Sequence, residues 1–141
     1  MNLKEMIERV HNYTNDTTGT LFPSSIIKGF VNEGIDRLKQ IKELEDVKYL
    51  TSDSDEPILI PKQYHYILSV YGASRCFSQD EQHYQAQTYM DEFSSLMSLL
   101  ELGIKEGNII ITDESGSTVT GVNDFDSVRD VYFTKVVVNN G

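Results

Sequence analysis

The chain has one cysteine, three prolines and no tryptophan among its 141 residues. A single cysteine, Cys76, excludes an intramolecular disulfide and indicates a reducing compartment. No stretch approaches the 18 or so apolar residues of a membrane-spanning helix, and the first residues lack the apolar run of a signal peptide. We therefore expect a soluble protein that is made in a cytoplasm and has no membrane partner.

Basic residues are also scarce, with 12 Lys and Arg against 22 Asp and Glu and a net charge of −10. Residues 1–45 carry six basic and seven acidic groups, which leaves six basic and fifteen acidic groups in residues 46–141. Proteins that bind the phosphate backbone tightly need clustered Lys and Arg. We therefore expect no specific nucleic-acid binding, although an acidic wall beside DNA would repel it and let it slide.

Residue patterns that support chemistry are missing as well. The three histidines, His11, His65 and His83, have no zinc-ligand spacing with the one cysteine. A nucleophilic pair of His65 and Cys76 would need a third group that orients the histidine, and none is placed for that role. We interpret Cys76 as a small core residue and His65 as partly exposed near a helix start.

The acidic runs Asp53–Glu56 and Asp124–Asp126 resemble calcium ligands only loosely, because neither fits the twelve-residue loop with glycine at its sixth position. We interpret them as solvated loops. A pair of carboxylates that acts as general acid and base stays open, since acids are plentiful and no pattern selects one pair. The overall expectation is a protein with no catalytic residue, no cofactor, no metal and no enzymatic activity.

Apolar residues at helical spacing predict four amphipathic helices. The expected ranges are about 2–13, 24–41, 62–77 and 81–102. Asn2 is the expected N-cap of the first helix, a serine that of the second, and Ser78 or Asp80 that of the fourth. The expected buried face of the fourth helix comprises Tyr84, Tyr89, Phe93, Leu96, Met97 and Leu100.

Two glycines, Gly29 and Gly34, interrupt the second helix. Each costs about 1 kcal/mol relative to alanine in a helix interior. Close packing against another helix is the usual compensation, and we predict it here.

Short β-prone pieces occupy residues 47–60, 109–112 and 131–138. The fold class is therefore mainly α: a small four-helix bundle with short β segments and an extended β-prone C-terminal arm. We expect the bundle to comprise residues 1–112 and the arm residues 113–141. Whether residues 47–60 form a hairpin is left open.

The arm is the least expected part of a helical protein. Residues 113–130 are polar and free of proline, and they would span up to roughly 60 Å if extended. The tip that follows is rich in strand-forming residues, whose backbone groups need a partner. We predict that it binds another chain through Val131, Tyr132, Phe133, Val136, Val137 and Val138.

The order of elements resembles a family of phage proteins. The residues that carry the resemblance are Leu21–Ser24, the helix Ile26–Leu38 with Asn32 and Glu33, the entry Ile60-Pro61, and the helices at Tyr64–Phe77 and Glu81–Leu100. Together they resemble the head–tail connector proteins of tailed bacteriophages, also called adaptor or head-completion proteins. The resemblance covers roughly residues 3–102 and includes no catalytic motif.

The resemblance implies a structural role in the virion neck. Copies of such proteins form a homo-oligomeric ring, commonly twelvefold, beneath the portal protein. The ring extends the channel through which DNA passes and provides a docking surface for a tail or stopper protein. Two alternatives remain: another phage neck, tail-completion or assembly protein, or a helical partner-binding module outside phages.

Overall fold

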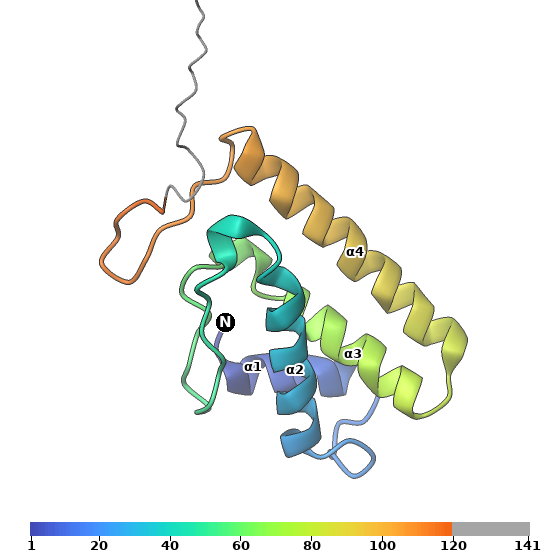
Figure 1. Cartoon of the computed structure of the whole chain (residues 1–141). Coiled ribbons are helices and arrows are strands. Elements are labelled where there is room, and N and C mark those ends of the chain that lie inside the picture. Colours follow the sequence, from blue (N-terminus) through green and yellow to red (C-terminus); the bar gives the residue numbers. More distant parts are fainter. Residues whose placement is uncertain (120–141) are drawn as a thin grey trace, which may run out of the picture.

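The computed structural model describes residues 1–119 and is mainly helical (Figure 1). Its α-helices are α1 (Leu3–Tyr13), α2 (Ser24–Leu38), α3 (Ile67–Gln79) and α4 (His83–Lys105). Two single 3-10 turns, η1 (Lys42–Leu44) and η2 (Lys62–Tyr64), lie in the connection between α2 and α3. The expected four helices are confirmed, whereas the arm from residue 120 onward lies outside the described residues.

Helix α3 is the centre of the structure and contacts each of the other three helices. Ten of its 13 residues are buried. Helix α4 packs along one side of α3, and α1 and α2 pack against it from the other side (Figure 1). The two outer layers therefore expose faces that point away from each other.

Helix α1 begins where the sequence predicts. The side chain of Asn2 accepts a hydrogen bond from the Glu5 N–H at 2.9 Å, and the Glu5 carboxylate accepts one from the Asn2 N–H at 2.8 Å. This reciprocal pair is a capping box, which satisfies two backbone donors at the helix start. The prediction of Asn2 as N-cap is confirmed.

The caps predicted for α2 and α4 are wrong. Pro23 stands at the N-cap of α2 without a side-chain hydrogen bond, because Ser24 already belongs to the helix. Ser78 still belongs to α3 and Asp80 is its C-cap, so α4 begins only after Gln82.

Helix α4 buries a narrower seam than predicted. Its buried residues are Ala86, Phe93 and Leu100, which recur every seven positions and face α3. Tyr84, predicted to be buried, is 82% exposed because it lies in the first turn on the outer side. A single buried seam leaves most of the surface of this 23-residue helix uncovered.

Residues 47–60 form a loop, so the prediction of strands there is wrong. The reason is a side chain that takes the place of a strand partner. The Asn32 amide accepts a hydrogen bond from the Leu50 N–H at 2.8 Å and donates one to the Leu50 carbonyl at 3.0 Å. Both backbone groups are thus satisfied by α2, while the Leu50 side chain lies in the core.

Residues 109–112 were also predicted to form a strand, and the structure shows only one antiparallel bridge there, between Thr112 and Thr118. The chain turns back at residues 113–117 instead of extending away from the bundle. The part of the arm that the structure describes therefore folds back on the residues before it.

The two glycines of α2 have different surroundings. A Cβ added at Gly34 would lie 3.1 Å from Leu68 Cδ2 and 3.3 Å from Tyr71 Cβ, whereas one added at Gly29 would meet nothing within 4 Å. The predicted close packing is confirmed for Gly34 and wrong for Gly29.

This difference gives a matched test of the packing. We expect Gly29→Ala to raise the free energy of unfolding by about 0.5–1 kcal/mol through helix propensity alone. Gly34→Ala should lower it by about 1–3 kcal/mol, since the Tyr71 Cβ is fixed to its own helix and cannot yield. Urea unfolding of both variants under monomeric conditions measures the two changes, and equal gains would contradict the close approach of α2 to α3.

Candidate functional site

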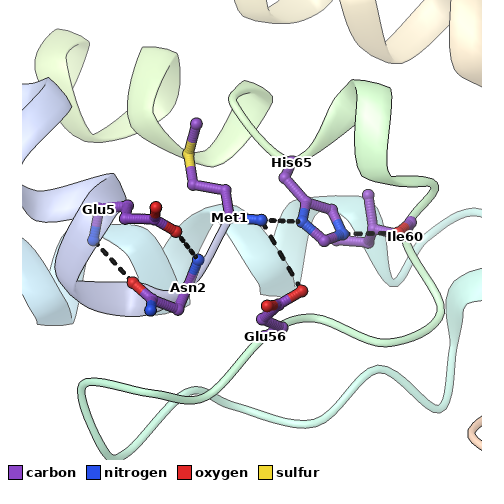
Figure 2. Close-up of polar contacts among 6 residues, drawn as sticks. All are labelled: Met1, Asn2, Glu5, Glu56, Ile60 and His65. Carbon is purple, nitrogen blue, oxygen red and sulfur yellow. Dashed lines mark hydrogen bonds and ion pairs between the residues drawn. The ribbon is translucent and has the colours of Figure 1, made fainter.

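A group of polar contacts lies where the chain start meets the loop before α3 (Figure 2). We call it the N-terminal cluster, and its members are Met1, Asn2, Glu5, Glu56, Ile60 and His65. His65 is only 2% exposed, so its predicted partial exposure is wrong. A buried imidazole needs partners for both ring nitrogens.

His65 has both partners. Its Nε2 lies 2.8 Å from the Ile60 carbonyl oxygen, which can only accept, so Nε2 carries the proton and donates. Its Nδ1 is then the acceptor and lies 3.1 Å from the Met1 α-amino group. That amino group also lies 3.7 Å from the Glu56 carboxylate.

This environment favours the neutral imidazole. Burial lowers the pKa of His65 below its ordinary value, and the hydrogen bond to Ile60 opposes the shift only in part. Because its lone pair already accepts from Met1, His65 is not placed to take a proton from a substrate. The cluster therefore has a structural role: its hydrogen bonds link α1, the loop and the start of α3.

The acidic loop at residues 51–56 belongs to the same junction. The Asp55 carboxylate accepts hydrogen bonds from the backbone N–H groups of Ser52 at 2.9 Å and Thr51 at 2.8 Å. These bonds, first of all that of Ser52, hold the pKa of Asp55 below its ordinary range. The Asp55 and Asp53 carbonyls in turn accept from the first N–H groups of α1.

The loop therefore caps the start of α1, and the Asp55 carboxylate is already occupied by hydrogen bonds within the loop. Among the described residues, no three His, Cys, Asp or Glu side chains are grouped so that they could hold a metal ion. The second acidic run, at Asp124 and Asp126, lies outside the described residues.

Cys76 is fully buried, as predicted for a core residue. Burial raises the pKa of its thiol to about 12. A thiol protonated at neutral pH is a poor nucleophile. Since both nitrogens of His65 are engaged elsewhere, the two residues do not form a catalytic pair.

Two of the exposed surfaces that carry apolar side chains lie on different layers of the bundle. The α4 patch is a shallow hollow that contains Leu99 and Leu102, 56% and 49% exposed. Its remaining lining residues are Ser94, Ser95 and Ser98. What we call the α2 patch comprises the exposed side chains of Leu21, in the loop before α2, and of Ile26, in its first turn, together with Gly29 one turn further on.

Neither patch is evident from helical periodicity, because periodicity finds the buried face. The available signal is the stretch from Ser94 to Leu100, seven residues without a charge on a helix whose acidic groups lie on either side. The predicted binding residues at 131–138 lie outside the described residues, so their contacts stay a prediction.

Comparison with known proteins gives no match to a family model, to a curated protein or to a solved structure. Within residues 1–119, no helix combines the length and the apolar character that a membrane crossing needs.

The N-terminal cluster predicts a pH dependence of stability. The pKa of His65 is lower in the folded chain than the value of 6.5 in the unfolded chain, so the unfolded state takes up a proton first as pH falls. Stabilisation by His65 is therefore complete above about pH 6.5 and declines below it, with a slope of at most about 1.4 kcal/mol per pH unit. Urea unfolding between pH 5 and 8 measures this decline.

The control variants separate His65 from other titrating groups. His65→Gln should flatten the dependence between pH 5 and 6.5, whereas His83→Gln, at an exposed position on α4, should preserve it. An unchanged slope in His65→Gln would show that the decline arises elsewhere.

Proposed function

We propose that this chain is a structural protein of a tailed-phage virion, a head–tail connector that forms a ring beneath the portal protein. The ring extends the DNA channel and provides the surface on which a tail or stopper protein docks. The observation that supports this best is the pair of unlike apolar patches on the two outer layers of the bundle. It adds to the resemblance in residues 3–102.

Unlike patches on opposite layers favour a head-to-tail arrangement of copies. In such a heterologous contact the α4 patch of one copy meets the α2 patch of the next, and repetition of one rotation closes a ring. The open side of Gly29 fits this arrangement, since a helix interior glycine that meets no other residue of 1–119 permits close approach by another chain.

The patches alone are too small to hold a ring together. Each of Leu21, Ile26, Leu99 and Leu102 is already about half buried. Covering the rest contributes about 1 kcal/mol per side chain, or roughly 3–6 kcal/mol in all. Association costs about 4–15 kcal/mol in lost motion, so a further contact is needed.

The C-terminal segment is the proposed source of that contact. Its strand-forming residues, 131–138, bind the portal or a neighbouring subunit by strand addition. The acidic excess, with a net charge of −10, favours a channel wall that repels DNA.

Assembly in solution tests the patches. Sedimentation velocity of the full chain should show one large species at high concentration, and Leu102→Glu should shift the population toward monomer at least tenfold because it buries a charge in the contact. Tyr84→Glu, on the same helix outside the patch, is the matched control and should assemble normally. A chain that forms only symmetric dimers would contradict the ring.

Location in the virion tests the function itself. Electron microscopy of purified particles that carry a labelled copy of this chain should place the label at the neck, between the capsid vertex and the tail. Label on the capsid shell or the tail tube, or particles without label, would overturn the proposal.

A further inference from the structure

Residues 109–119 form a small hairpin attached to the end of α4. The Asp113 N–H donates to the Ser117 carbonyl at 2.9 Å, and the Val119 N–H donates to the Ile111 carbonyl at 2.8 Å. These two bonds surround the bridge between Thr112 and Thr118. The turn is closed by the Asp113 carboxylate, which accepts from the Ser115 and Ser117 N–H groups.

One side of this hairpin is fixed to the bundle. Ile111 is 2% exposed and lies in the core. The side chain of Ile109 packs so closely over Gly103 of α4 that a Cβ there would collide with it. The first strand of the hairpin therefore has a defined position, which a docking partner requires.

The outer edge of that strand directs backbone groups away from the hairpin. In an antiparallel pair, residues such as Thr112 that lie between the paired bonds direct their own N–H and C=O away from the partner strand. Within residues 1–119, no hydrogen bond uses the backbone groups of Ile110 or Thr112. The Ile110 side chain beside them is 65% exposed.

We propose that this edge receives residues 131–138 of a neighbouring copy as an added strand. The inference rests on the proposed function, which supplies the neighbour, and it names the surface that the C-terminal segment binds. Added strands satisfy backbone groups along an open edge, and alternate side chains give the pairing its register. Ile110 provides an apolar contact for the valines and aromatic residues of the segment.

The length and starting point of the remaining chain favour a neighbour as the donor. It continues from Val119, on the other side of the hairpin, and the 11 residues from 120 to 130 span at most about 36–40 Å. Strands that follow one another in sequence are neighbours roughly two-thirds of the time, so a copy's own segment favours the edge beside Val119 over the outer edge at Thr112. The segment of a second copy has no such constraint.

Every copy would then carry one donor segment and one acceptor edge. Such a contact is heterologous, like that between the α2 and α4 patches, and therefore repeats around a ring. A linker of this length also holds the donor near the acceptor once the patches touch, which raises its effective concentration.

Proline variants test the edge without breaking the hairpin. Thr112→Pro removes the outward N–H of the acceptor edge, and Thr118→Pro removes the corresponding group on the other edge. Proline at either position removes no hydrogen bond of the hairpin, because neither N–H takes part in it. Val137→Pro disrupts the donor segment.

The decisive experiment mixes full-length copies with complementary defects. An isotope-labelled Val137→Pro copy has an intact edge, and an unlabelled Thr112→Pro copy has an intact donor. We expect the Ile110 and Thr112 amides of the labelled copy to exchange with solvent at least tenfold more slowly after mixing. An unlabelled Thr118→Pro copy is the control. Its donor segment is also intact, so it should protect the same amides equally well.

The other outcomes overturn the inference in distinguishable ways. No slowing on mixing, while sedimentation still shows assembly, would mean that the ring forms without this edge and would leave the proposed function intact. Equal protection in a dilute, monomeric wild-type chain would mean that the segment binds its own edge. Absence of both assembly and slowing would count against the edge and the ring together.

Discussion

The close approach of α3 to α1 and α2 is the constraint on which the rest of the structure depends. A Cβ at Gly72 of α3 would lie 3.0 Å from Val10 Cγ2 of α1, and Gly34 allows a similar approach from α2. Because α1 and α2 pack so closely against α3, only one side of α3 remains uncovered by them. Helix α4 packs on that side through its single buried seam. The exposed surface of α4 therefore follows from how tightly the other three helices pack.

The connection between α2 and α3 shows why sequence patterns predicted the helices better than the loops. A helix satisfies its backbone locally, so periodicity and the cap at Asn2 locate α1 from neighbouring residues alone. Leu50, at the end of the strand-like run at residues 47–50, pairs with the Asn32 side chain 18 residues earlier. No local pattern contains that pairing, and propensity alone favours a strand.

His65 illustrates the same limit for the candidate site. Its burial depends on an amino group 64 positions earlier and on the carbonyl of Ile60. A sequence reading that places a histidine near a helix start has no reason to bury it. Cys76 was predicted correctly because a small apolar residue inside a helical stripe needs no distant partner. The α4 patch could not be predicted for a third reason. The exposed surface of a helix depends on which of its side chains the neighbouring elements cover, and the sequence pattern does not contain those contacts.

Side chains engage several of the backbone groups that lack a helical partner in the loops: Asp16 accepts from the Phe22 N–H at 2.7 Å, Asp55 holds its own turn, and Asn32 pairs with Leu50. The edge at residues 110–112 has no such side-chain partner among the described residues. Ile110 combines an exposed apolar side chain with backbone groups that no described residue engages. An unpaired strand edge of this kind is a template for pairing with another chain, which is the reason for proposing it as the acceptor of the C-terminal segment.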